Sequence, residues 1–112
     1  MTHFMSLRPS PFSKIASGEK TFELRLYDEK RQLIKVGDFI EFTCTDDDTR
    51  QLTVRVKALH RFCDFAQLYA SLPLEKCGYR DVSKADPGDM DAYYPREKQE
   101  KYGVVGIEIE LV

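Results

Sequence analysis

The sequence predicts an α+β fold in which a small mixed or antiparallel sheet closes into a β-barrel with peripheral helices. Three observations support this prediction. The 112 residues, 42% hydrophobic and 32% charged, have the size and composition of one globular domain spanning residues 1–112. Strand-like and helix-like hydrophobic periods follow one another along the chain. Most predicted strands are separated by turns too short for parallel crossovers, and a barrel hides the edges of its sheet.

The first quarter of the chain is predicted to form a strand, a short helix and a second strand. Residues 3–7 form the first strand, and the helix covers residues 11–17. Ser10 is a favoured N-cap residue, and a proline in the first helical position loses no hydrogen bond there. Residues 21–26 alternate strictly between polar and apolar side chains, which is typical of a half-buried strand.

A hairpin is predicted in the middle of the chain. The charged segment 27–35 is expected to be a loop, and it leads to a strand over residues 39–44. Polar residues at 45–50 form the tip, and a long strand over residues 52–62 follows.

The C-terminal half changes to a helical period and ends in a strand. A helix begins after Asp64, which is a favoured capping residue, and residues 74–85 are irregular. A helical turn begins at residues 86–87, and a further helix covers 96–102. The alternating segment 104–112 is predicted to be the last strand.

The net charge shows that the protein is not basic as a whole. Seventeen Lys and Arg against nineteen Asp and Glu give a net charge of −2, so any contact with nucleic acid must come from a local patch. Bases are nevertheless concentrated locally, because residues 1–18 and 52–62 contain bases and no acid. The average charge thus conceals a possible polarity of the surface.

Localisation and metal chemistry are constrained by what the sequence lacks. No apolar run approaches the roughly 20 residues of a membrane helix, and the N-terminus does not resemble a signal peptide, so a cytoplasmic protein without membrane contact is expected. An odd number of cysteines without CxxC spacing argues against a disulfide framework and a zinc ribbon. Neither a metal site nor a cofactor is predicted. The cysteines are Cys44, Cys63 and Cys77.

The segment from Gly18 to Arg25 is the most informative for function. Alternation places Thr21, Glu23 and Arg25 on one strand face, expected to be exposed opposite the apolar residues, with Lys20 beside them. The two cations can bind phosphate or a carbonyl oxygen, and the carboxylate can orient a cation or accept a proton. The alternative is a solvated face whose charges merely pair. On an exposed face, removing both cations is expected to leave the fold intact.

The sequence resembles the ASCH domain, a small domain similar to PUA and named after the human activating signal cointegrator. The resemblance covers essentially the whole chain. It implies a PUA-like β-barrel with peripheral helices and a cleft beside the barrel for RNA or another nucleotide-containing ligand. Lys20, Glu23 and Arg25 would line that cleft. The resemblance rests on Pro11-Phe12, Ile15, Gly18-x-Lys20-x-x-Glu23-x-Arg25, Gly37-Asp38 and the closing segment 102–107.

Three functional hypotheses follow. The first is an RNA- or nucleotide-binding ASCH domain. The second is a small hydrolase, since ribonuclease activity has been attributed to bacterial ASCH proteins: Glu23 would act as the base, while Lys20 and Arg25 stabilise the phosphorane. Amidohydrolases that deacetylate N4-acetylcytidine are similar at Gly18, Lys20 and Thr21, but Glu23 stands where they carry a nucleophilic threonine, so their mechanism does not transfer. The third is a protein-interaction module.

Further candidates lie outside the motif. Lys30 and Arg31 are close to it in sequence and are predicted to contact phosphate. Arg55 and Lys57 share one strand face, which is more simply explained as a solubilising surface. Tyr79 is the preferred residue for stacking on a base. The expected aromatic core consists of Phe12, Phe22, Phe39, Phe42, Phe62 and Phe65.

Overall fold

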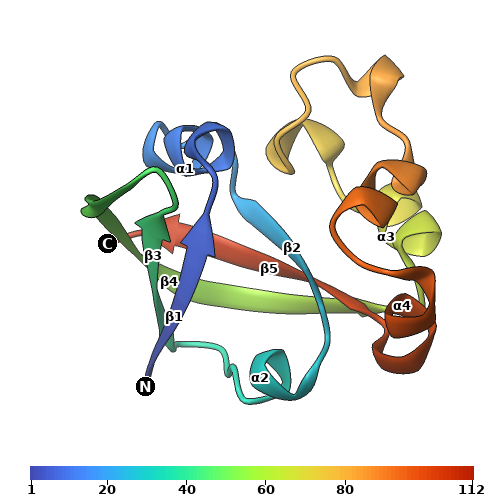
Figure 1. Ribbon diagram of the computed structural model, residues 1–112, viewed down its shortest axis with the longest axis horizontal. Coiled ribbons are helices and arrows are strands. Elements are labelled where there is room, and N and C mark those ends of the chain that lie inside the picture. Colours follow the sequence, from blue (N-terminus) through green and yellow to red (C-terminus); the bar gives the residue numbers. More distant parts are fainter.

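Five strands form one curled sheet in the order β1-β3-β4-β5-β2 (Figure 1). The computed structural model describes residues 1–112 and confirms the predicted α+β fold. β1 and β3 are parallel, and all other neighbours are antiparallel. The strands are β1 (Thr2–Leu7), β2 (Phe22–Leu26), β3 (Phe39–Cys44), β4 (Asp47–Phe62) and β5 (Val104–Leu111).

The helices gather at the ends of the sheet and beyond β2. α1 and α2 lie at opposite ends, whereas α3, α4 and three short 3₁₀ turns lie together on the far side of β2 (Figure 1). No helix has both the length and the apolar character needed to cross a membrane. The helical elements are α1 (Pro9–Ala16), α2 (Glu29–Gln32), α3 (Phe65–Ser71), η1 (Leu74–Lys76), η2 (Val82–Lys84), η3 (Pro87–Ala92) and α4 (Arg96–Tyr102).

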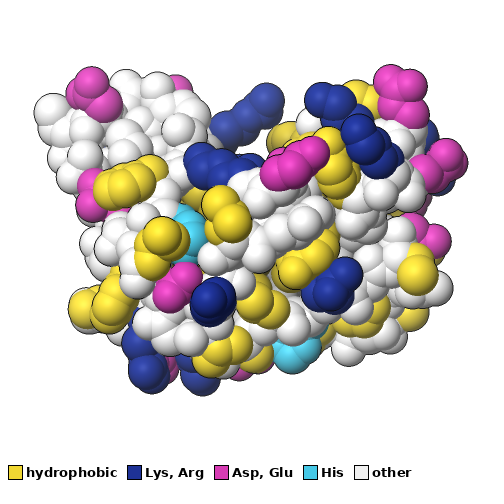
Figure 2. All heavy atoms as spheres, turned by 90° about the horizontal axis from the view of Figure 1, so that it is seen from below, with side chains coloured by type: hydrophobic (Ala, Val, Ile, Leu, Met, Phe, Trp, Pro, Cys, Tyr) yellow, Lys and Arg dark blue, Asp and Glu magenta, His cyan; other side chains and the backbone are white.

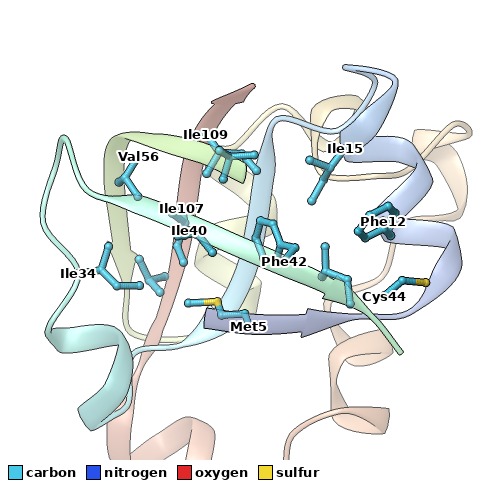
Figure 3. Packing of buried hydrophobic residues seen from close by; sticks show 13 residues of the cluster. Met5, Phe12, Ile15, Ile34, Ile40, Phe42, Cys44, Val56, Ile107 and Ile109 are labelled. Carbon is cyan, nitrogen blue, oxygen red and sulfur yellow. The ribbon is translucent and has the colours of Figure 1, made fainter. Parts of the chain in front are cut away.

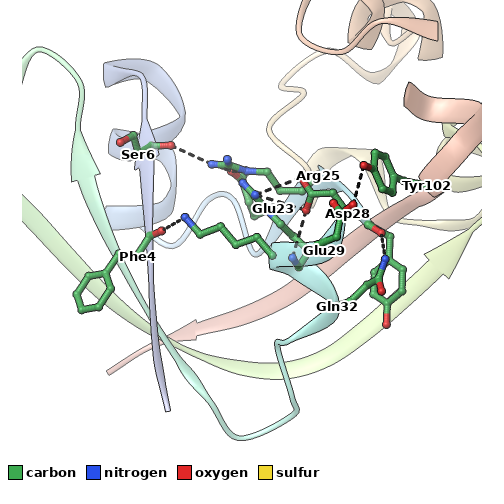
Figure 4. A network of polar contacts seen from close by, with 11 residues as sticks. Phe4, Ser6, Glu23, Arg25, Asp28, Glu29, Gln32 and Tyr102 are labelled. Atoms are coloured by element: carbon green, nitrogen blue, oxygen red, sulfur yellow. Dashed lines mark hydrogen bonds and ion pairs between the residues drawn. The ribbon is translucent and has the colours of Figure 1, made fainter. Parts of the chain in front are cut away.

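Side chains bridge the seam between the two edge strands, β1 and β2. Arg25 Nη2 donates a hydrogen bond to the Ser6 carbonyl at 2.9 Å, and Lys30 Nζ donates one to the Phe4 carbonyl at 2.7 Å (Figure 4). The barrel is therefore completed by two cationic side chains rather than by a fifth pair of hydrogen-bonded strands.

The first hydrophobic core fills the inside of the curled sheet (Figure 3). Alternate residues of β1, β3, β4 and β5 point into it, as period-2 alternation requires. Phe12 and Ile15 of α1 and Ile34 after α2 also pack into this core. Each removes most of its apolar surface from water, which is the main source of stability for such a domain.

A second core lies between β2 and the C-terminal helices. Phe22, Leu24 and Leu26 of β2 pack with Phe65 and Leu68 of α3. β2 therefore separates two cores, and each of its faces is covered by protein.

The pairing of β2 with β5 determines which face of β2 points to the inside of the curled sheet. Glu23 lies opposite Ile107, and Arg25 lies opposite Val105. Directly opposed residues of antiparallel strands share a face, and both β5 residues belong to the core inside the sheet. Glu23 and Arg25 therefore point to the inner side of the curled sheet, while the apolar residues of β2 point to α3.

The boundaries of two helical elements differ from the prediction. α1 begins at Pro9 because Arg8, not Ser10, has the extended backbone of an N-cap. α2 forms inside the predicted loop and is capped by Asp28, whose side chain accepts a hydrogen bond from the Arg31 N–H. A four-residue helix carries too little periodicity to be recognised in a sequence.

Two of the predicted core phenylalanines differ from expectation. Phe39 is 37% exposed, because Ile40 and Phe42 of the same strand face the core and Phe39 therefore lies on the outer side. Phe62 is partly buried against the second core.

On the face of the molecule seen in Figure 2, side chains of both charges are interspersed with hydrophobic ones.

Candidate functional site

A pocket of about 920 Å³ opens beside β2. Its walls come from the end of β1, from α1, from β2 and from the segment between α3 and α4, so distant parts of the sequence meet there. We call it the β2 pocket. Its charged lining residues are Arg8, Lys14, Lys20, Arg25, Glu23 and Asp89.

A buried ion-pair network lies on the β2 side of this pocket. Glu23 is only 4% exposed. Lys20 Nζ lies 2.9 Å from Glu23 Oε1, and Arg25 Nη2 lies 2.8 Å from Glu23 Oε2, which also accepts a hydrogen bond from Arg25 Nε at 2.9 Å (Figure 4). Each carboxylate oxygen is thus held by its own cation.

Electrostatics favour the charged forms of Glu23 and Arg25. Burial by itself opposes ionisation of Glu23, but the charges and hydrogen bonds of Lys20 and Arg25 outweigh it and lower the pKa of this carboxyl. Burial likewise opposes the charge of Arg25, and Glu23 outweighs it, so the pKa of Arg25 is raised. Two cations and one anion give this side of the pocket a net positive charge.

The expectation that Glu23 and Arg25 lie on an exposed face is wrong. Alternation separates the two faces of a strand, but it does not say which face contacts solvent. Here the apolar face is covered by α3, and the polar face borders the inside of the sheet and the β2 pocket. Removing Lys20 and Arg25 together would leave Glu23 as an unpaired buried charge, so that double substitution is destabilising.

Two further cations come from the start and the last turn of α1. Lys14 Nζ donates a hydrogen bond to the Gly78 carbonyl at 2.7 Å, which ties α1 to the segment after η1. The guanidinium of Arg8 lies over the ring of Tyr93, 5.4 Å from its centroid. Neither residue was a predicted site residue, although the absence of acids from residues 1–18 was a signal for both.

Another part of the pocket wall carries hydroxyl and carboxylate groups. Tyr69 and Tyr79 share a hydrogen bond of 2.7 Å between their hydroxyl oxygens, and the Tyr79 hydroxyl donates to Asp89 Oδ2 at 2.9 Å. Tyr93 and Tyr94 line the pocket nearby. Tyr79 was predicted from the sequence to contact ligand, and it borders the β2 pocket. Tyr69 and Asp89 were missed, because nothing local in the sequence places them beside β2.

Cys77 also borders the pocket, close to Lys20. Burial raises the pKa of its thiol to about 11, although Lys20 acts in the opposite direction. The thiol is therefore almost entirely protonated at neutral pH and is a poor nucleophile.

The structure does not bring three other predicted residues into the β2 pocket. Thr21 precedes the first residue of β2 and borders a separate, smaller hollow. Lys30 is engaged with the Phe4 carbonyl at the seam, and Arg31 pairs with Asp28 across 3.4 Å. Thr21 lies between the turn after α1 and the first residue of β2, and its carbonyl accepts a hydrogen bond from the Ile109 N–H.

Arg55 and Lys57 pair on the outer face of the sheet, away from the β2 pocket. Arg55 forms an ion pair with Glu110, and Lys57 Nζ lies 3.8 Å from Glu108. Their contacts are those of a solvated strand face with neighbouring opposite charges.

Comparison with known proteins identifies the class of fold and then the family. The structure is similar over 97% of its length to ASCH from Zymomonas mobilis, covering 66% of that chain, with a TM-score of 0.66 and 16% identity. A family model for the ASCH domain matches residues 5–112, and the chain belongs to the ASCH domain family.

Two solved structures are more similar. Hypothetical protein PH0355 is 32% identical, with a TM-score of 0.83 and complete coverage of both chains. Protein PF0455 from Pyrococcus furiosus is 36% identical, with a TM-score of 0.75 and coverage of 100% of this chain and 98% of the other. No curated protein matches the sequence.

Proposed function

We propose that this protein binds RNA or a nucleotide-like ligand in the β2 pocket. The observation that carries the proposal is the concentration of charge: four cationic and two acidic side chains line this pocket in a protein whose net charge is −2. A concave site with such a local excess of positive charge attracts an anionic ligand despite the acidic average.

The four cations of the pocket form two groups that would contribute to binding in different ways. Arg8 is exposed and Lys14 is half-buried, so both can meet a phosphate group that approaches from solvent. Lys20 and Arg25 are held in place by Glu23, so little side-chain entropy is lost when they donate to a ligand.

Aromatic residues beside the cations support a nucleotide-containing ligand. Tyr69, Tyr79, Tyr93 and Tyr94 border the same pocket. A tyrosine ring that stacks on a base contributes about 1–3 kcal/mol, and stacking is the common means by which proteins hold unpaired bases. The resemblance to ASCH domains supports RNA as the source of such a base.

The hydrolase alternative receives less support from the site. A general base works best when its pKa lies near the operating pH, whereas the two cations lower the pKa of Glu23. The raised pKa of Cys77 similarly disfavours a thiolate nucleophile. Glu23 is better suited to positioning Lys20 and Arg25 than to accepting a proton.

The proposal is tested by removing charge at the rim of the pocket without breaking the buried network. In the double variant Arg8→Gln and Lys14→Gln, single-stranded RNA pentamers should bind at least tenfold more weakly than to the wild type. The slope of log affinity against log salt concentration should also fall by about one for each phosphate group that the variant no longer neutralises. Fluorescence anisotropy at several salt concentrations measures both quantities.

A matched control removes the same charge elsewhere. Lys35 and Lys84 are exposed and form no ion pair, so Lys35→Gln with Lys84→Gln should leave affinity and slope nearly unchanged. Equal reductions of affinity in the two double variants would contradict the assignment of the β2 pocket, as would wild-type binding that does not respond to salt.

A further inference from the structure

The Tyr69, Tyr79 and Asp89 wall has a defined direction of hydrogen bonding. The Tyr79 hydroxyl has one proton, and it donates that proton to Asp89 Oδ2. The hydrogen bond between the two tyrosines must therefore run from the Tyr69 hydroxyl to the Tyr79 oxygen. We call this arrangement the hydroxyl chain.

Both hydroxyls keep their protons at neutral pH. Burial raises the pKa of Tyr69 and of Tyr79. In Tyr79 the hydrogen bonds to Tyr69 and Asp89 act in the same direction as burial. The direction of the chain therefore does not change across the neutral range.

The donors of the hydroxyl chain are used internally, so what it offers to the pocket is acceptors. Both tyrosine protons are committed, which leaves lone pairs on the Tyr69 and Tyr79 oxygens. Asp89 Oδ2 accepts from Tyr79 and from the Asp86 N–H, whereas Oδ1 has no hydrogen-bond partner. A polar ligand group that meets the hydroxyl chain must donate hydrogen bonds.

The cations and the hydroxyl chain are thus complementary to two different parts of one ligand. Lys20, Arg25 and Lys14 offer only donors, since an ammonium or guanidinium accepts no hydrogen bond, and both oxygens of the neighbouring Glu23 already accept from Lys20 and Arg25. The hydroxyl chain has only acceptors free and carries a carboxylate. A nucleotide has both kinds of end: an anionic phosphate, and a base edge with N–H donors.

We propose that the hydroxyl chain selects nucleotides whose base carries an exocyclic amino group, with Asp89 Oδ1 as the acceptor that receives its N–H. The inference rests on the proposed function and deepens it. Asp89 is assigned as a specificity-determining residue because its free, charged oxygen is the strongest acceptor on this wall. The neighbouring ring of Tyr79 contacts the base while the edge of the base reaches Asp89.

The test compares ligands that differ only in the amino group. The probes are adenosine 5′-monophosphate and an adenylate pentamer, each paired with its counterpart in which purine riboside, which lacks the amino group, replaces adenosine. Wild-type protein should bind the amino-bearing member of a pair about tenfold more tightly, the size expected for one hydrogen bond to a charged group. NMR titration for the monophosphates and fluorescence anisotropy for the pentamers give the affinities.

The variant Asp89→Asn reverses the chemistry at one position. The amide oxygen can still accept the hydrogen bond from Tyr79, while the amide nitrogen turns the free position from an acceptor into a donor. The preference for the amino group should fall to about one. Asp81→Asn removes the same charge from the same part of the chain, outside the pocket, and should keep the wild-type preference.

The outcomes separate this inference from the proposed function. Binding that is weakened by Arg8→Gln and Lys14→Gln but shows no preference within the pairs overturns the role of Asp89 and leaves the proposed function standing. If the preference for the amino-bearing ligand persists in Asp89→Asn, the assigned role of Asp89 is overturned as well. If neither the monophosphates nor the pentamers bind, both the proposed function and this inference fail.

Discussion

Glu23 is the residue on which the cationic side of the β2 pocket depends. Its carboxylate is almost fully buried and contacts Lys20 and Arg25 within 3 Å. Without it, two like charges would face each other in a poorly solvated place, and Arg25 would lose the partner that orients it toward the seam with β1. Glu23 therefore links the geometry of the binding site to the stability of the barrel.

This dual role predicts a characteristic dependence on pH. Because the folded-state pKa of Glu23 is lower than its ordinary value of 4.5, its ionised form adds stability above that pH. The contribution disappears as the pH falls through the folded-state value. Glu23→Gln should lower the free energy of unfolding at pH 7 by about 3 kcal/mol, and the difference from wild type should shrink in acid.

Chemical denaturation at a series of pH values measures this difference. Glu100→Gln is the matched control, because Glu100 is exposed on α4 and forms no ion pair. Its stability should follow the wild type at every pH. A deficit in Glu23→Gln that stays constant from neutral pH into acid would show that the buried charge is not its cause.

At the scale of elements, the junction between α4 and β5 is the most constrained turn. Gly103 has φ of 70° and ψ of −171°, a combination that essentially only glycine adopts. A Cβ at this position would lie 3.0 Å from the Phe62 carbonyl oxygen. The turn aligns β5 with both β4 and β2, so it also sets the register that points Glu23 inward.

Gly103→Ala should therefore destabilise the protein by about 2 kcal/mol. Gly18→Ala is an informative comparison, because Gly18 has φ of 82° but open space around the added Cβ. Thermal or chemical unfolding should show the larger loss of stability for Gly103→Ala. Equal destabilisation would mean that the close approach to the Phe62 carbonyl has no energetic effect.

The elements of the fold were largely predictable, whereas their orientation was not. Periodicity is local, so it located β3 with its observed bounds and placed α3, α4 and β5 to within a residue. The orientation of β2 depends on what covers each of its faces, and the apolar face is covered by α3, which follows about 40 residues later. The sequence pattern distinguished the two faces of β2, but it did not show which elements of the fold cover each face.

The same difference between local pattern and long-range packing explains which residues of the candidate site could be predicted. Lys20, Glu23 and Arg25 were predictable together because they lie within six residues of one another. Tyr69 and Asp89 were not, because their proximity results from the packing of α3 and η3. Lys30 was expected near phosphate because of its sequence position, but α2 directs it to the Phe4 carbonyl instead.

At the scale of the whole molecule, positive and negative side chains gather in different places on the surface. Four cations meet at the β2 pocket, whereas acids such as Glu108 and Glu110 lie on the outer face of β5, paired with Lys57 and Arg55. A net charge of −2 therefore coexists with an electropositive pocket. Because this patch is small, a ligand that places one or two nucleotides in the pocket is favoured over a long electrostatic track.

The most direct test of the central claim is to map where RNA binds on the folded protein. In a titration of ¹⁵N-labelled protein with a single-stranded RNA pentamer, followed by amide chemical shifts, the largest changes should occur at Lys20, Arg25 and Tyr79. The amides of Arg55 and Lys57 on the outer face should change little. Largest changes on that outer face, with the β2 pocket unaffected, would contradict binding in the β2 pocket.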